Sequence, residues 1–212
     1  MKKDKKKTWI SEDKSQKYIG EFDFDGKKHG EGTYIWEGIG EVTGKFENDQ
    51  LPSYGKFLQY DEFEYIGEMK NRDGQFNGKG VLINLVTKDK LEGEFKNGAL
   101  NGYGVLIQND GSTFKGNWKN SLKHGKGTLV NASFFRSGEE NGEEFIADGG
   151  PLSGEYKDDL PIGEFYWEMT SGRKYVGEIN KNGVFHGKGI LTHPDGSMEK
   201  GIWENGKLVK PN

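Results

Sequence analysis

The sequence predicts an all-β protein: an elongated single-layer antiparallel meander of stacked β-hairpin repeats, forming a twisted rod or groove. Glycine supplies 34 of the 212 residues, about 16% against a usual ~7%, while apolar residues make up only 32%. A thick two-layer core is therefore not expected. The 13% aromatic content is too high for a disordered chain, and the glycines follow no collagen period.

A repeat accounts for the glycines. The stretch YIGEFDFDGKKHGEGTYIW from Tyr18 returns as YIGEMKNRDGQFNGKGVLI and as YVGEINKNGVFHGKGILT. Other copies have diverged, and two of them contain Leu-Pro in place of the full G-x-G. We count eight units in residues 18–212, starting at Tyr18, Val42, Tyr65, Leu91, Phe114, Leu152, Tyr175 and Glu199.

Each unit predicts one hairpin. Its first strand has the pattern aromatic-x-Gly-x-aromatic, in which residues two apart share a face. A polar turn with Asn-Gly or Asp-Gly character follows, and these residues readily adopt positive φ. The second strand begins with Gly-x-Gly and continues to the next turn, such as QNDGS at 108–112 or HPDGS at 193–197. Helix is disfavoured because closely spaced glycines each cost about 1 kcal/mol there.

The alternation places glycines and aromatic rings on one face. A glycine in a strand is destabilising unless something packs on its bare backbone, and a ring from a neighbouring strand can lie over it. We therefore predict that the glycines are seats for rings and that none needs to contact a ligand. The predicted structural glycines are Gly20, Gly30, Gly32, Gly67, Gly78, Gly80, Gly93, Gly102, Gly104, Gly116, Gly125, Gly127, Gly154, Gly177, Gly187 and Gly189.

The pattern Y-x-G-x-(F/W)-x-x-G-x-x-x-G-x-G resembles the MORN (membrane occupation and recognition nexus) repeat. The resemblance covers about nine tenths of the chain, and eight copies in register make it specific. It implies a rod or groove of stacked hairpins that acts mainly as a protein-interaction scaffold at cytoskeletal, including ciliary, or membrane-associated structures. The two Leu-Pro units, Glu199 in place of an aromatic residue, and the segment between Val130 and Pro151 depart from the pattern.

The leading functional prediction is a non-enzymatic adaptor that presents an aromatic-lined groove to a helix or extended peptide of a partner protein. Ring residues would be the anchors, with part of each ring in the core. The predicted partner-binding residues are Tyr18, Phe22, Trp36, Tyr65, Phe95, Phe114, Trp118, Tyr156, Tyr175 and Trp203. The free terminal strands also allow an end-to-end homodimer in place of a monomer.

Residues 1–17 are predicted to form a basic, disordered arm. Their net charge of +4 leaves −8 for the rest of the chain, and so acidic a body argues against nucleic-acid binding. The arm is either a solvated terminus or a contact for anionic surfaces. The alternative function is accordingly a module that targets anionic phospholipid through Lys2, Lys3, Lys5, Lys6 and Lys7.

Residues 131–151 interrupt the repeat and combine Phe134 and Phe135 with several glutamates. Interruptions of repeat arrays often form loops on a binding face. A tolerated spacer or a diverged hairpin is the other interpretation, and the sequence leaves both open.

No arrangement of residues indicates catalysis, a metal or a cofactor. His29, His124 and His186 take one position in three separate units, and GVFHGKG at 183–189 lacks the Ser or Thr and the helix of a phosphate loop. No nucleophile lies beside a recognisable base. The repeated glutamate after the first glycine indicates a solvated row or a track for cations or basic peptides, at Glu21, Glu68, Glu94, Glu155 and Glu178.

Cysteine is absent, which fits a reducing compartment, and no apolar run approaches the ~20 residues of a membrane span. The lysine-rich start is not followed by the apolar region of a signal peptide. We therefore expect a cytoplasmic protein, associated with the cytoskeleton, a cilium or a membrane.

Overall fold

The computed structural model describes residues 6–69, 75–130 and 149–212. The described residues form seventeen β-strands and no helix, as predicted for an all-β chain of hairpins. The chain divides into two compact units, residues 1–100 and 101–212, which are described separately. The prediction of one continuous array over 18–212 stays a prediction.

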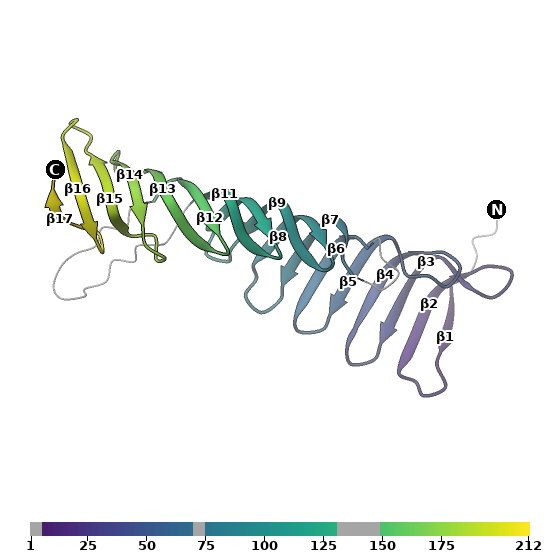
Figure 1. Cartoon of the computed structure of the whole chain (residues 1–212). Coiled ribbons are helices and arrows are strands. Elements are labelled where there is room, and N and C mark those ends of the chain that lie inside the picture. The colour runs from purple at the N-terminus through teal and green to yellow at the C-terminus, as the bar shows by residue number, and fades with distance from the viewer. Residues whose placement is uncertain (1–5, 70–74, 131–148) are drawn as a thin grey trace. The chain divides into compact units, whose positions relative to one another are not determined.

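The first unit is an antiparallel meander in which each strand pairs with the next one along the chain (Figure 1). Its strands are β1 (Lys7–Ile10), β2 (Gln16–Phe22), β3 (Lys28–Trp36), β4 (Gly40–Phe46), β5 (Tyr54–Gln59), β6 (Phe63–Glu68), β7 (Gly78–Asn84) and β8 (Lys90–Lys96).

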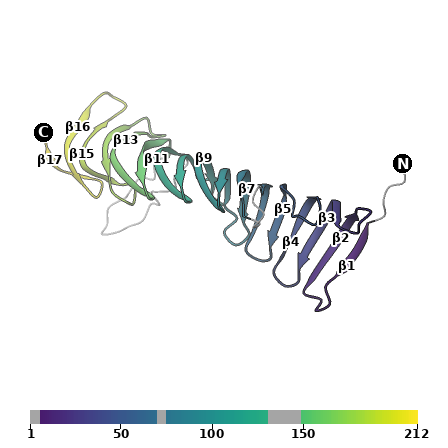
Figure 2. The same ribbon diagram turned by 45° about the vertical axis from the view of Figure 1, so that its right-hand side comes forward.

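The second unit repeats this topology, and Figure 2 shows its strands following one another without a crossover. The strand β9 begins at the last two residues of the first unit. The strands are β9 (Ala99–Ile107), β10 (Thr113–Lys119), β11 (Leu122–Val130), β12 (Leu152–Lys157), β13 (Leu160–Glu168), β14 (Lys174–Ile179), β15 (Phe185–Thr192), β16 (Met198–Glu204) and β17 (Lys207–Pro211).

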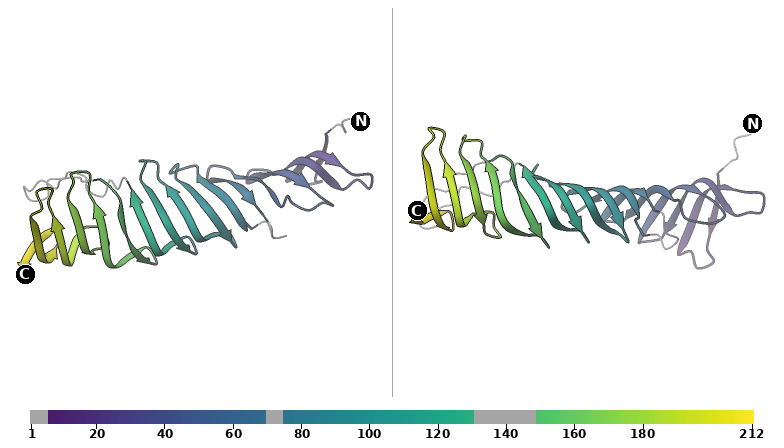
Figure 3. Two further views of the ribbon diagram at one scale, coloured as in Figure 1. Left: turned by 90° about the horizontal axis from the view of Figure 1, so that it is seen from above. Right: turned by 45° about the horizontal axis from the view of Figure 1, so that its top comes forward.

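Each unit is a single layer of strands, as Figure 3 shows from two further directions. One face, which we call the ring face, carries Tyr18, Tyr65, Phe114 and Tyr175, and all four side chains are at most 1% exposed. The core is therefore a sheet of rings packed on backbone, which explains how a chain with so few apolar residues folds.

The register is built on a row of directly opposed glycines. In the first unit the row runs without a break through β2 to β8, as Gly20, Gly32, Gly44, Gly55, Gly67, Gly80 and Gly93. In the second unit the row includes Gly104, Gly116, Gly127, Gly154, Gly177, Gly189 and Gly201, with Phe165 of β13 opposite Gly177. The sequence analysis missed Gly44, Gly55 and Gly201.

The N-terminal arm differs from the prediction of disorder over residues 1–17. Lys7–Ile10 forms β1, which pairs with β2 and places Trp9 opposite Tyr18. The connecting turn is closed by hydrogen bonds from the Ser11 amide to the Gln16 carbonyl and from Lys14 to Ser11, both 3.0 Å long. Residues 1–5 lie outside the described residues, as do residues 131–148 of the predicted insert.

Candidate interaction surfaces

The repeated tyrosine packs over two glycines of the row. The Tyr18 ring lies against Gly20, two residues later in its own strand, and against Gly32 of the next strand. The predicted ring seats are therefore present, but the ring comes from the same strand as the first glycine and not from a neighbouring strand. The Tyr18 hydroxyl then donates a hydrogen bond to the Glu21 carbonyl, 3.0 Å away.

Tyr65 and Tyr175 repeat this arrangement. Their hydroxyls donate to the carbonyls of Glu68 and Glu178, at 2.9 Å and 2.8 Å. Each ring also stacks on a phenylalanine with centroids 3.8 Å apart, Phe76 in one case and Phe185 in the other. Burial raises the pKa of Tyr18 and of Tyr65 to about 12, because an ionised phenol would lose its hydration there.

The first glycine of each G-x-G has a different role from the one predicted. Gly30 and Gly187 have φ values of +63° and +65°, and each lies where the strand pairing shifts register, in the manner of a β-bulge. The side chains of Glu21 and Glu178 lie directly against these two glycines. These carboxylates therefore pack on bulges, which the prediction of a plain solvated row did not include.

Most of the predicted anchors are core residues. Eight of the ten are at most 7% exposed: Tyr18, Tyr65, Phe95, Phe114, Trp118, Tyr156, Tyr175 and Trp203. Trp36 and Phe22 are half-buried. The eight buried rings offer little surface to a partner, because they are already covered by their neighbours; partner binding by the ten residues stays a prediction.

Partly exposed rings gather on the ring face of the first unit. Tyr34, Trp36, Phe57 and Phe63, which we call the ring patch, are all half-buried. Their centroids follow one another at 4.9, 6.3 and 5.9 Å. Only Trp36 of the four was among the predicted anchors. Tyr34 lies in the same strand as Trp36 and was not chosen as an anchor, whereas Phe57 and Phe63 lie outside the aromatic-x-Gly-x-aromatic segments from which most anchors were taken.

A lysine closes one end of this cluster. The Lys28 ammonium lies 4.7 Å from the Trp9 ring centroid and 5.5 Å from that of Tyr34, and it forms an ion pair with Asp49 at 3.3 Å. Cation–π contacts of this kind hold β1 and β3 together. The backbone amide of Lys28 also donates to Asp49, which lowers the pKa of that carboxyl.

Lys123 occupies the equivalent place in the second unit. Its ammonium lies 5.1 Å from the Phe114 ring centroid, and its backbone amide donates to Asp159 at 2.9 Å. Burial lowers the pKa of Lys123, and the Asp159 charge partly opposes this. Both lysines precede His-Gly, and both aspartates end a turn that is followed by Leu-Pro, so this arrangement is repeated in the two units.

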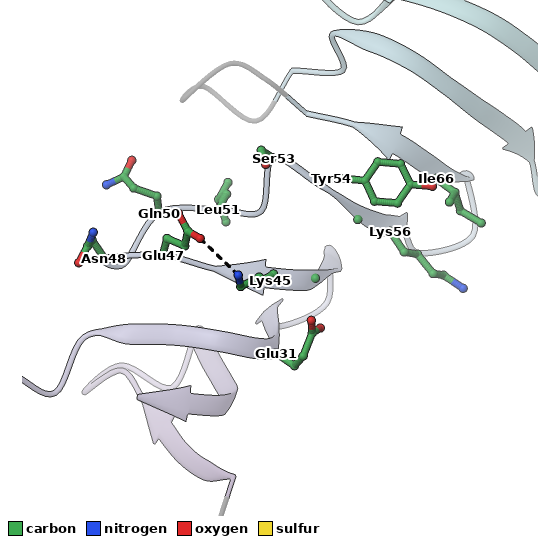
Figure 4. A pocket seen from close by; sticks show the side chains of 12 residues that line it. Glu31, Lys45, Glu47, Asn48, Gln50, Leu51, Ser53, Tyr54, Lys56 and Ile66 are labelled. Atoms are coloured by element: carbon green, nitrogen blue, oxygen red, sulfur yellow. Dashed lines mark ion pairs between the residues drawn. The ribbon is translucent and has the colours of Figure 1, made fainter. Parts of the chain in front are cut away.

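The Leu-Pro repeats open grooves on the face opposite the rings. The groove of the first unit, about 790 Å³, is drawn in Figure 4. Lys45 and Glu47 form an ion pair at 3.6 Å on its wall, Glu31 lies on the far side, and Tyr54 lies beside Ile66 (Figure 4). On the ring face of the same repeat, Pro52 packs over Gly44 where other repeats place a ring.

The second unit has a smaller groove of about 430 Å³ at the corresponding strands, lined by Lys126, Thr128, Ser153, Glu155, Glu164 and Tyr166 among others. The opposed pair Glu31 and Lys45 of the first groove is replaced by Lys126 and Glu155, with the signs reversed. Sequence analysis did not find either groove, because the Leu-Pro units were treated only as departures from the repeat.

The three histidines considered for a metal site are not brought together. His29 lies in β3, His124 in β11 and His186 in β15, and His124 pairs with Asp158 at 3.2 Å. Over residues 6–69, 75–130 and 149–212, no group of three His, Asp or Glu side chains could hold a metal ion. The described residues also include no helix able to cross a membrane. Of the five lysines predicted to contact anionic surfaces, only Lys6 and Lys7 are described, and both are exposed.

Comparison with known proteins identifies the repeat. The family model of the MORN repeat matches residues 18–38, 65–83, 92–113, 114–133 and 175–198, together half of the chain. The matches leave out the two Leu-Pro units and the C-terminal unit, so five of the eight predicted repeats are detected. A search of curated proteins found no match.

Two solved structures are similar in part. The TCP domain of SAS-4 (dCPAP) from Drosophila melanogaster, in complex with a proline-rich motif of Ana2 (dSTIL), is 13% identical, with 84% of this chain and 85% of that one covered and a TM-score of 0.46. The TCP10 domain of Danio rerio CPAP, bound to a STIL peptide, is 10% identical, with coverage of 87% and 83% and a TM-score of 0.37. At these values neither likeness bears on function.

Proposed function

Because the chain belongs to the MORN-repeat family, we propose that it is a non-enzymatic protein-interaction scaffold whose ring patch receives an apolar segment of a partner protein. The observation that supports this proposal is the run of half-exposed rings at Tyr34, Trp36, Phe57 and Phe63. Rigid aromatic side chains lose little conformational entropy on binding and dominate interface energetics.

The ring patch suits a helix or an extended peptide better than a polar ligand. Its four rings come from three strands, β3, β5 and β6, and neighbouring rings are tilted against one another with centroids 4.9 to 6.3 Å apart. A partner with two or three apolar side chains on one side would cover the exposed ring edges and expel water from them. We further propose a site of action at a cytoskeletal or membrane-associated structure in the cytoplasm.

The experiment is affinity capture by the full chain, followed by titration of the captured protein. Trp36→Gln and Phe63→Gln should each weaken binding of that protein tenfold or more, about 1.4 kcal/mol. Glu94→Gln, on an exposed side chain of β8, is the matched control and should retain binding within twofold. Circular dichroism would establish that every variant is folded. Full binding by both ring variants would contradict the proposal.

Anionic phospholipid binding through the exposed Lys6 and Lys7 is the alternative function. Co-sedimentation with phosphatidylserine vesicles separates the two, because an exposed lysine contact is screened by salt whereas apolar contacts on rings largely persist. Vesicle binding that is lost between 20 and about 150 mM salt, together with no protein captured through the ring patch, would favour the lipid function.

A further inference from the structure

We propose that β1 pairs antiparallel with β1 of a second copy of this chain, so that two molecules join through their N-terminal strands. Within the described residues β1 pairs only with β2, so the amide and carbonyl of every second residue of β1 have no partner strand among them. Such an edge is a template for another strand. This edge adjoins the ring patch at Tyr34, but the pairing uses the backbone of β1, and the proposal does not depend on the proposed function.

Contacts with neighbouring residues fix the conformation of β1. Trp9 is fixed on the ring face by its stack on Tyr34, 6.4 Å between centroids, and by the Lys28 ammonium. The turn at residues 11–16 is tied by Asp13, which accepts hydrogen bonds from the Ser11 hydroxyl at 2.6 Å and the Ser15 amide at 3.0 Å. A strand ordered in advance loses little entropy when it acquires a neighbour.

The side chains of β1 protect it less than those of the other terminal strand. Trp9 is 38% exposed and Ile10 is 53% exposed, and β1 contains one lysine, Lys7, and no proline. The other terminal strand, β17, has the sequence KLVKP, in which Lys207, Lys210 and Pro211 are the residues that natural sheets use to block an edge. The two terminal strands of the chain therefore differ, and β1 is the one open to pairing.

Charge selects a second copy as the occupant. Lys6 and Lys7 lie at the start of β1, whereas the turn after it carries Glu12 and Asp13 with Lys14, for a net charge of −1. In an antiparallel pair of β1 strands the basic start of each copy faces the acidic turn of the other. Pairing of β1 with β17 would instead bring Lys6 and Lys7 to Lys207 and Lys210. Like charges opposite one another are destabilising, which disfavours open filaments.

The symmetry of the pair places the exposed ring. Two antiparallel strands related by a two-fold axis normal to the sheet keep both ring faces on one side, and opposed residues share a face. The register that pairs Thr8 of each copy with Ile10 of the other sets Trp9 opposite Trp9 of the second copy, which covers both rings. Because four-residue strands bury little area, the dimer should be weak and should depend on concentration.

Sedimentation of the full chain from about 10 µM to 1 mM tests the proposal. We expect the apparent mass to rise up to twofold, less so at 0.5 M salt. Ile10→Lys should keep the chain monomeric over the range, while the matched change in the other terminal strand, Val209→Lys, should leave the rise intact. A strictly monomeric wild type, an equal rise for Ile10→Lys, or growth beyond twofold would each overturn the proposal.

Charge-reversal variants separate loss of β1 pairing from loss of folding. The pair of changes Lys6→Glu and Lys7→Glu gives a chain with acidic groups at both ends of β1, and Glu12→Lys gives one with a basic excess at both ends. Each variant alone should remain monomeric, because like charges meet. A 1:1 mixture should recover the mass increase, since each basic end again faces an acidic one; no recovery in the mixture would count against β1 pairing.

Discussion

At the scale of single residues, the glycine row determines how closely neighbouring strands can approach one another. A Cβ atom added to Gly177 would lie 2.5 Å from the Gly189 Cα, 2.6 Å from the Lys188 carbonyl oxygen and 2.7 Å from the Tyr175 hydroxyl. Two of these three neighbours are backbone atoms of the adjacent strand, which cannot move without disturbing the ladder. The row therefore lets neighbouring backbones approach closely and leaves room for a ring above them.

We expect Gly177→Ala to lower the free energy of unfolding by about 1–3 kcal/mol, because the added methyl group forces apart two paired strands. Gly149→Ala is the matched control: its added Cβ would meet only Thr170 side-chain atoms at 3.4 Å and beyond, an ordinary contact. This change should alter stability by less than about 0.5 kcal/mol. Denaturant unfolding measures both, and equal effects would contradict the steric role of the row.

The buried tyrosines predict alkaline instability. Burial raises the pKa of Tyr18, Tyr65 and Tyr156 to about 12, whereas an unfolded tyrosine ionises near 10. Between these values the folded chain binds more protons than the unfolded chain, so stability should fall as the pH rises from about 10 to 12. In a pH titration followed by phenolate absorbance, the folded chain should show a step near pH 12. The amplitude of this step should be smaller in Tyr65→Phe. If all nine tyrosines ionised near pH 10 in the folded chain, the predicted loss of stability between pH 10 and 12 would be contradicted.

At the scale of elements, several hairpins combine an ordinary ladder with one bulge, among them β2–β3, β10–β11 and β14–β15. The pairing of β14 with β15 runs in register from Lys174 to Gly177 and then shifts, so that Ile179 lies opposite Phe185. The shift brings Phe185 over the Tyr175 ring at 3.8 Å. In this hairpin the bulge therefore lets the second strand fold a ring back over the tyrosine that covers the glycines.

The turn before β2 gives a prediction for one hairpin. Hydrogen bonds from Ser11 and Ser15 hold the pKa of Asp13 at about 2, so the turn should be stabilised above about pH 4 and lose that support as the pH falls toward 2. The NMR signal of the Trp9 indole N–H should then shift toward its position in Asp13→Ala. Asp195→Ala, which alters a similar turn bonded to Ser197, is the control and should leave Trp9 unchanged. A Trp9 signal that ignores both pH and Asp13→Ala would refute the prediction.

The hairpins and their ring face followed from the sequence because period-two alternation and Asn-Gly turns are local signals. The bulges did not follow: Gly30 and Gly32 look alike in the sequence, and only the pairing with β2 separates a positive-φ glycine from a ring seat. Pro52 over Gly44 was also missed, because a proline in a repeat was interpreted as a break and not as a replacement for the ring.

At the scale of the whole molecule, burial decides which predicted anchors are available. A ring such as Tyr175, 0% exposed, is covered by Phe185 and Trp203, while Trp36 keeps part of its surface. The sequence could place both on the ring face, since that depends on parity. It could not separate them, because exposure depends on which neighbouring strands carry large side chains at the same level.

Within each unit, every strand pairs with the strand just before or just after it in the chain. Apart from the pair β11 and β12, which residues 131–151 join, no strand has to wait for a partner that is synthesised much later, and loop-closure entropy is lost only over short connections. A hairpin leaving the ribosome therefore has all its hydrogen-bonding partners either already present or arriving next. The order in which the protein is made is the same as the order in which its sheets can grow.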